Sequence, residues 1–257
     1  MTGAATLASV AALRMGSGLV TVVSPAESVL LYRATNPSLL VEQYSEMARF
    51  KDHFKDHRRN AVLIGPGAGL ENVGALKKSV LDAVQSPEQK ICVLDADALS
   101  VFEDAPAVLT KVLGPHCILT PHEGEFYRLF PDIQGSKPEK AFAAARRTGA
   151  IIVLKGADTV IASPEAQLVI NSNGSGWLAS AGTGDVLAGM IAGLAARDII
   201  SPFDAACAAV WMHGRASELA GAGMISSDLA CHIPAVWKEL LNPAESEAQE
   251  DEESSED

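Results

Sequence analysis

The chain has few of the residues that mark disulfide-rich, membrane-spanning or metal-binding proteins. Its four cysteines, Cys92, Cys117, Cys207 and Cys231, never occur with Cys-x-x-Cys spacing, so we expect buried thiols in a reducing compartment. No apolar stretch is long and uninterrupted enough to span a membrane, and the amino terminus lacks the pattern of a secretory signal. These absences predict a cytoplasmic protein with no membrane contact.

Positive charge is also scarce. The chain has 20 Lys and Arg against 32 Asp and Glu, a net charge of −12. Residues 244–257 contain eight of those acids and no base, so we expect a disordered acidic tail there. The shortage of basic residues argues against a nucleic-acid partner. The remaining length suits one large domain, over residues 1–243.

Aromatic residues make up only 5% of the chain, while 48% of it is hydrophobic. That balance favours an α/β core of small residues over a β-sandwich. Short apolar runs alternate with helical patterns, which indicates a mainly parallel sheet covered on both faces. The predicted strands are residues 19–23, 61–64, 91–94, 117–120 and 151–154, with a hairpin at 160–162 and 168–170. The predicted helices are residues 1–15, 71–85, 137–148 and most of 185–241; residues 24–59 look polar and mixed.

Polar or glycine-rich clusters follow these apolar runs, at the ends where parallel sheets bind ligands. They are Gly65-Pro66-Gly67, Asp95-Ala96-Asp97, Thr120 to Glu125, Lys155 to Thr159, and Gly182 to Asp185. The last cluster leads into an apolar helical run. Glycine amides at a helix amino terminus bind anions, and a nearby carboxylate can accept a proton from a substrate hydroxyl. Asp185 is therefore a candidate base, the alternative being a helix cap.

In this order the clusters resemble the ribokinase-like superfamily, and most closely the bacterial ADP-dependent NAD(P)H-hydrate dehydratases. The resemblance extends from Thr2 to about Leu241. It implies a three-layer α/β/α fold with a mainly parallel central sheet. It also implies dehydration of (S)-NAD(P)H hydrate back to NAD(P)H, driven by ADP or ATP with Mg²⁺. The ring hydroxyl is phosphorylated and phosphate then leaves, a reaction that needs positioning more than covalent chemistry.

The resemblance also implies roles for individual residues. Asp185 is the base and contacts the hydrate together with Ala5, Gly67 and His122; Ala4 is the next candidate after Ala5. Glu125 is the candidate for Mg²⁺, through water. The nucleotide segment is Lys155, Gly156, Ala157, Asp158 and Thr159, with Gly184, and the anion hole is Gly182, Thr183 and Gly184.

Each role has a structural alternative. His122 is equally suited to a structural hydrogen bond, Glu125 to the first turn of a helix, and Lys155 to a surface turn. Asp95 and Asp97 either support the site or cap a helix beginning near Ala98. For the whole chain, the alternatives are a kinase of the hydroxyethylthiazole or hydroxymethylpyrimidine type and a non-catalytic nucleotide-binding module.

The resemblance departs at the amino terminus. Such domains open with a strand and a glycine-rich turn, whereas here Met1 directly precedes Thr2-Gly3-Ala4. We therefore expect that the first strand is missing, and that a form extended upstream is more stable and binds the hydrate better. The resemblance also implies a homo-oligomer, such as a tetramer, and an NAD(P)H-hydrate epimerase domain as an upstream partner.

Overall fold

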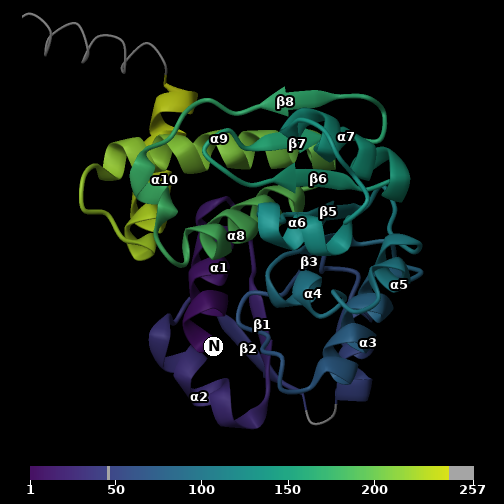
Figure 1. Ribbon diagram of the computed structural model, residues 1–257. Coiled ribbons are helices and arrows are strands. Elements are labelled where there is room, and N and C mark those ends of the chain that lie inside the picture. Colours follow the sequence, from purple (N-terminus) through teal and green to yellow (C-terminus); the bar gives the residue numbers. More distant parts are fainter. Residues whose placement is uncertain (45–46, 243–257) are drawn as a thin grey trace, which may run out of the picture.

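The computed structural model describes residues 1–44 and 47–242, so the predicted tail lies outside the described residues. Two groups of helices enclose a central sheet (Figure 1), which confirms the predicted three-layer α/β architecture. In the described part of the chain, no helix is long and apolar enough to cross a membrane. The strands of the main sheet are β3 (Ala61–Ile64), β4 (Ile91–Leu94), β5 (Cys117–Leu119), β6 (Ile151–Leu154), β7 (Val160–Ala162) and β8 (Leu168–Ile170).

The main sheet has the order β3-β4-β5-β6-β7-β8. Neighbours from β3 to β6 pair in parallel, whereas β7 and β8 run antiparallel as the predicted hairpin. Strands β5, β6 and β7 are buried throughout, and β4 is buried from its second residue. This explains their near-continuous apolar sequences, because strands of a covered parallel sheet bury both faces.

One face of the sheet packs on α3 (Val73–Val84), α4 (Asp97–Ser100), α5 (Pro106–Thr110), α6 (Glu123–Leu129) and α7 (Lys137–Thr148). The other packs on α1 (Thr2–Arg14), α8 (Thr183–Ala195), α9 (Pro202–Ala220) and α10 (Ser226–Leu241). The pleat separates the two cores: Cys92 and Leu94 enter the first, and Val93 enters the second. The prediction that the cysteine thiols are buried is confirmed for Cys92 and Cys117. It is wrong for Cys207, which is only partly buried, and for Cys231, which is exposed.

Helices α1 and α8 lie unusually close together. A Cβ on Gly189 would be 2.0 Å from the carbonyl oxygen of Ala8, and one on Gly193 would be 2.5 Å from that of Ala12. Only glycine permits this approach of two backbones. The α1–α8 contact matters for function because α8 carries Asp185 in its first turn.

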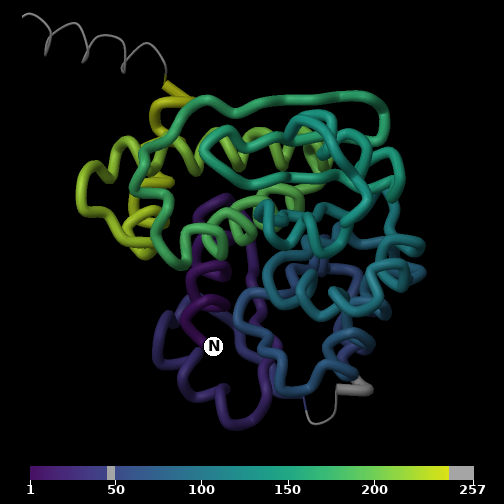
Figure 2. Tube along the Cα trace, in the orientation of Figure 1, coloured from purple at the N-terminus to yellow at the C-terminus, as the bar shows by residue number. Residues whose placement is uncertain are grey.

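The amino-terminal strands form a second sheet. Strand β1 (Thr21–Ser24) pairs in parallel with β2 (Leu40–Gln43), apart from the six-stranded sheet. Figure 2 follows the purple end of the chain through α1, β1, α2 (Ala26–Thr35) and β2 before it reaches β3. Residues 24–59, which look polar and mixed and to which the sequence assigned no element, form α2, β2 and the 3₁₀ helix η1 (Met47–Lys55). The expectation that a preceding strand completes the main sheet stays a prediction.

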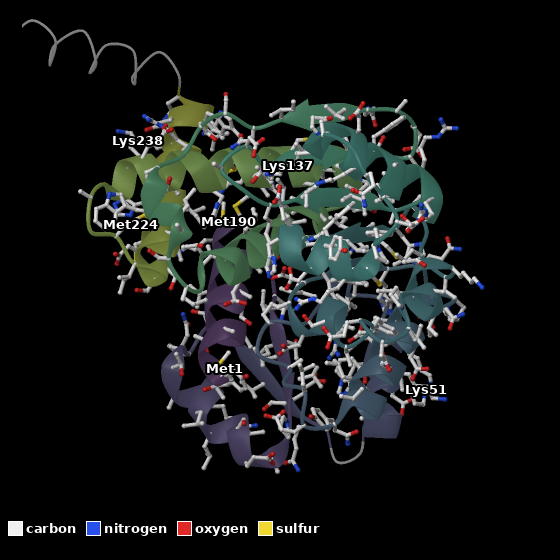
Figure 3. All side chains as sticks on the ribbon, viewed as in Figure 1. Met1, Lys51, Lys137, Met190, Met224 and Lys238 are labelled. Carbon is white, nitrogen blue, oxygen red and sulfur yellow. The ribbon has the colours of Figure 1, made fainter. Side chains whose placement is uncertain are left out.

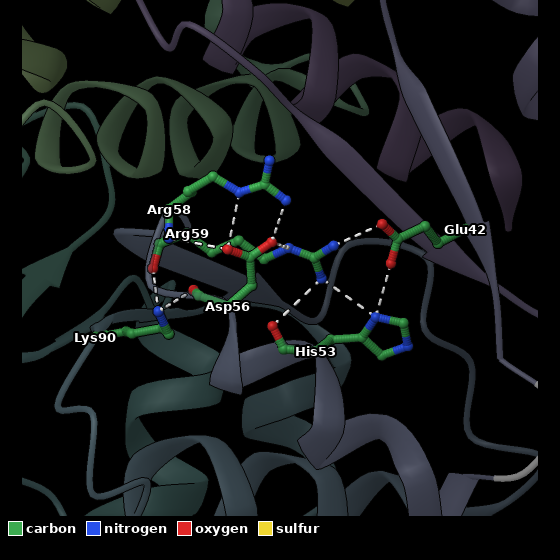
Figure 4. Close-up of polar contacts among 6 residues, drawn as sticks. All are labelled: Glu42, His53, Asp56, Arg58, Arg59 and Lys90. Carbon is green, nitrogen blue, oxygen red and sulfur yellow. Dashed lines mark hydrogen bonds and ion pairs between the residues drawn. The ribbon is translucent and has the colours of Figure 1, made fainter.

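A polar network fastens the small sheet to the start of β3 (Figure 4). The Arg59 guanidinium donates to Glu42 Oε1 at 2.6 Å and to the His53 carbonyl at 3.3 Å. Hydrogen bonds with Arg59 are the main reason that the pKa of Glu42 lies below its usual range. The buried Lys90 ammonium donates to the carbonyls of Asp56 and Arg59. These bonds hold β2, η1 and β3 together.

We expect Arg59→Met to lower the free energy of unfolding by about 1 kcal/mol, because it removes several hydrogen bonds at once but leaves the half-exposed Glu42 hydrated. Urea unfolding measures this. Arg58→Met is the matched control, since the Arg58 side chain is 73% exposed and bonds only to Asp56. Equal losses in the two variants would contradict a fastening role for Arg59.

Candidate active site

The site forms where β4, β5 and β6 end. Asp95, which follows β4, is almost fully buried, and its Oδ1 accepts hydrogen bonds from Lys155 Nζ at 2.7 Å and from Thr120 Oγ1 at 2.8 Å. Lys155 follows β6, and its backbone amide donates to the Pro121 carbonyl at 2.9 Å. Asp95 therefore connects the end of β4 to the ends of β5 and β6 and fixes the lysine ammonium. The surface-turn alternative for Lys155 is wrong, because its side chain is only 18% exposed.

The first turn of α8 lies beside this ion pair. Gly182 precedes the helix with φ of 89°, and no side chain caps the helix, so Asp185 is not a cap. A Cβ on Gly184 would be 3.4 Å from Lys155 Nζ. The glycine amides at the start of α8 and the ammonium are thus neighbours, which is the charge arrangement that a phosphoryl group requires.

The environment of Asp185 makes its carboxyl a weak acid. Its pKa is raised from an ordinary 3.8 to about 6, mainly by burial and also by the charges of Asp95, Asp97 and Glu125, while Lys155 opposes the rise. A base with a pKa near the working pH combines a large deprotonated fraction with useful basicity. Because a perturbed carboxyl in a polar cluster often marks a catalytic group, the electrostatics agree with the geometry here.

The Thr183 hydroxyl and the His213 ring hold the anion-hole segment in place. The Thr183 hydroxyl donates to the carbonyls of Leu178 and Ser180 at 2.7 and 2.9 Å, so Thr183 can offer an anion only its amide. His213 on α9 is buried, and its Nε2 lies 3.0 Å from the Thr183 carbonyl. Burial lowers the pKa of His213 to about 4, so the ring is neutral and donates from Nε2. The helical pattern of the sequence around His213 does not indicate that its ring contacts Thr183.

His122 and Glu125 form a capping box at the start of α6. His122 Nδ1 accepts from the amides of Gly124 and Glu125 at 3.0 and 3.2 Å, and Glu125 Oε2 accepts from the His122 amide at 2.9 Å. The structural alternatives for both residues are therefore correct. They leave a ligand role open, because the His122 side chain is 55% exposed and its Nε2, which lies 3.6 Å from Glu125 Oε1, makes none of the capping hydrogen bonds. Burial is the main cause that raises the pKa of Glu125.

The predicted nucleotide segment is a tight turn between β6 and β7. Thr159 Oγ1 donates to the Gly156 carbonyl at 2.9 Å and closes the turn. The segment has a second cation, which no sequence motif indicated: Lys137, labelled in Figure 3, donates to Asp158 Oδ1 at 2.7 Å. Its Nζ would lie 2.2 Å from a Cβ on Gly156. Ala157 and Asp158 complete the turn, and its binding of the nucleotide stays a prediction.

Of the amino-terminal candidates for substrate contact, Ala4 lies close to Gly67 and Ala5 does not. A Cβ on Gly67 would lie 3.4 Å from the Ala4 Cβ. Ala5 instead packs on the small core of Val22, Tyr32 and Leu39. Ala4 therefore faces the 65–69 loop more directly than Ala5 does. The hypothesis that Asp95 and Asp97 cap a helix is wrong, because α4 begins at Asp97 and has no side-chain cap.

The carboxylates of the site suit Mg²⁺ only when nucleotide phosphates supply further ligands. No group of three or more Asp, Glu, His or Cys side chains among the described residues could hold a metal by itself. Mg²⁺ keeps several waters and needs one or two carboxylates together with substrate phosphates. Glu125 is suited to such a contact through Oε1, which takes no part in the capping hydrogen bonds and lies 3.6 Å from His122 Nε2.

The mainly parallel sheet, with the glycine-rich start of α8 and the paired lysine at the end of β6, defines a protein of the ribokinase-like fold class. A family model described as NAD(P)H-hydrate dehydratase matches residues 1–237. The chain belongs to the NAD(P)H-hydrate dehydratase family.

Three relatives illustrate the likeness. The ADP-dependent (S)-NAD(P)H-hydrate dehydratase of Neisseria meningitidis is 34% identical, over 94% of this chain and 81% of its own. The bifunctional NAD(P)H-hydrate repair enzyme Nnr of Moorella thermoacetica is 36% identical over 95% of this chain, which spans 48% of that relative. A crystal structure of the ADP/ATP-dependent NAD(P)H-hydrate dehydratase from Bacillus subtilis, co-crystallised with ATP and Mg²⁺ and soaked with CoA, has a TM-score of 0.78. It is 33% identical, and the match covers 93% of this chain and 87% of that one.

Proposed function

We propose that the chain dehydrates (S)-NAD(P)H hydrate to NAD(P)H with ADP as the phosphoryl donor. The observation that carries the proposal is the Asp185 carboxyl, whose pKa is raised to about 6, in the first turn of α8 behind glycine amides and beside Lys155. A base next to an anion site is what transfer of a phosphoryl group to a hydroxyl requires. Family membership supplies the substrate.

In this proposal Asp185 takes the proton of the ring hydroxyl as the hydroxyl oxygen bonds to the terminal phosphorus of ADP, and the bond from that phosphorus to AMP breaks. The amides of Gly182, Thr183 and Gly184 stabilise the charge on the transferred group. The carbon–oxygen bond then breaks, phosphate leaves, and a ring proton is lost to restore NAD(P)H. The products are NAD(P)H, AMP and phosphate, so atoms and charge balance.

The remaining roles follow the positions of the side chains. Lys155 to Thr159 and Gly184 bind the nucleotide, and Lys155 supplies a point charge to phosphate. Gly67, His122 and Ala5 or Ala4 contact the hydrate. Mg²⁺ would be held by Glu125 through water and by the nucleotide phosphates, and it would neutralise charge on those phosphates.

The experiment incubates the full chain with hydrated NADH and ADP and follows the return of NADH absorbance, with AMP and phosphate quantified. We expect NADH formation that depends on nucleotide, and parallel reactions with ATP and with hydrated NADPH define the preferences. Phosphorylation of hydroxyethylthiazole without NADH formation would support the kinase alternative. Binding of ADP without either product would support a non-catalytic module.

A further inference from the structure

The turn between β4 and α4 is strained at a single residue. Ala96 has φ of 46° and ψ of −118°, a backbone conformation that residues other than glycine rarely adopt. Such backbone persists only when the surroundings over-determine it, and it concentrates at functional sites. Ala96 stands between Asp95, which binds Lys155, and Asp97. The question is therefore what the strained turn holds in place.

The side chains on either side of Ala96 bind different parts of the site. Asp95 reaches Thr120 and Lys155, on the nucleotide side. Asp97 Oδ2 instead accepts the Gly69 amide hydrogen at 2.8 Å, across 28 residues of sequence. That bond ties α4 to the loop of residues 65–69. The strained backbone at Ala96 allows the carboxylates of Asp95 and Asp97 to bond to two different segments.

The 65–69 loop also packs tightly against the backbone of the same turn. A Cβ on Gly65 would lie 1.7 Å from the Asp95 carbonyl oxygen and 3.2 Å from the Ala98 Cβ. Gly65 has φ of 128°, which only glycine adopts readily. The loop is therefore held by backbone contact at Gly65, by the Asp97 bond at Gly69, and between them by Met1, whose ammonium donates to the Gly67 carbonyl at 2.9 Å.

We propose that Asp97 is a positioning residue for the hydrate: held in direction by the strained Ala96, it fixes the 65–69 loop so that Gly67 meets the substrate at a set distance from Asp185. This rests on the proposed function, in which Gly67 contacts the hydrate. Asp97 acts through the Gly69 amide and contacts neither the hydrate nor ADP. Its own charge also reaches Asp185, because it is among the groups that raise the pKa of that carboxyl.

The test compares Asp97→Ala, Asp97→Asn and Asp104→Ala in the full chain. Alanine removes the acceptor for the Gly69 amide, so we expect KM for the hydrate to rise about tenfold, as for the loss of one charge-assisted hydrogen bond. We expect kcat and the Kd for ADP to change less than about threefold. Asparagine retains an acceptor oxygen and should restore most of the loss. Asp104→Ala makes the same charge change at an exposed pair with Lys77 and should have no effect.

Ala96→Gly separates positioning from stability. Glycine relieves the unfavourable φ, so we expect a higher urea midpoint for unfolding. We also expect a higher KM for the hydrate, because the backbone no longer fixes the orientation of the Asp97 carboxylate. A merely structural role predicts that stability and KM improve or worsen together. A variant that is both more stable and unchanged in KM would overturn the proposal for Ala96.

Hydrogen exchange at the Gly69 amide tests the positioning without turnover. Asp97→Ala should speed exchange there, and Asp97→Asn should slow it again. If the parent chain makes no NADH, the proposed function fails while this measurement still decides whether Asp97 fixes the loop. Unchanged exchange in Asp97→Ala, or equal changes in hydrate KM and ADP Kd, would overturn the positioning role.

Discussion

Asp185→Asn should lower turnover of the hydrate about 10²- to 10⁴-fold, the usual contribution of a general base. The amide has the same shape but cannot accept the hydroxyl proton. No side chain caps α8, so the substitution removes no cap. Binding of ADP should persist, because Lys155 and the amides of Gly182 to Gly184 stay in place. Stopped assays of NADH formation and calorimetric titration with ADP measure the two quantities.

Asp204→Asn is the matched control for this experiment. Asp204 occupies the same position in α9 that Asp185 occupies in α8, the third residue of the helix, but it is exposed and bonds to Ser201. A helix-dipole effect would act on both variants, whereas a catalytic effect acts on Asp185 alone. Turnover of Asp185→Asn within a few-fold of the parent would reject the base.

The raised pKa of Asp185 also predicts how activity and stability depend on pH. The base must be ionised, so kcat/KM should fall as pH drops below about 6. The folded state holds this proton more tightly than the unfolded chain, so ionisation costs stability as pH rises from the ordinary pKa of 3.8 to about 6. Asp185→Asn should therefore be more stable than the parent at pH 7, and this gain should disappear near pH 4. Urea unfolding at both pH values checks the sign.

The sequence predicted the main sheet because its strands are buried on both faces. Runs such as Ile151–Leu154 are apolar at every position, and the clusters that follow them had to meet at one edge. Residues 24–59 escaped prediction for the opposite reason. Strand β2 buries none of its four residues fully, and α2 buries only Val29 and Tyr32. Exposed elements carry little hydrophobic periodicity, so their existence depends on contacts that a single segment does not reveal.

At the site, the sequence identified residue types but not most of their partners. Asp95 and Lys155 are separated by 60 residues, and Lys137 and Asp158 by 21. For Asp95 and Asp97 the sequence left support of the site and helix capping open, because local rules consider only partners that are near in sequence. The carboxylates instead bond to Lys155, Thr120 and the Gly69 amide. Long-range polar partners are set by the folded sheet, which explains why sequence motifs could propose site residues but could not identify the groups that hold them.

Lys155→Met should have two large effects that can be separated. The substitution leaves Asp95, whose side chain is 2% exposed, without its cation. Removing one partner of a buried ion pair costs about 3 kcal/mol of folding stability, at the lower end of the usual range because Thr120 still donates to Asp95. Loss of the ammonium beside Gly184 should also weaken ADP binding about 10- to 100-fold, as expected for a charge-assisted contact.

The double variant Asp95→Asn/Lys155→Met distinguishes the two effects. A neutral amide still accepts the Thr120 hydroxyl and leaves no unpaired buried charge, so most of the lost stability should return. Affinity for ADP should stay low, because the phosphate contact is still absent. Lys78→Met, which removes an exposed lysine paired with Asp82 on α3, controls for the loss of one positive charge. Urea unfolding and calorimetric titration are made on all four proteins, with the parent also titrated at high salt, where screening should weaken ADP binding. Recovery of both stability and ADP affinity in the double variant would show that Lys155 serves only to neutralise Asp95, and that the nucleotide is bound by other groups.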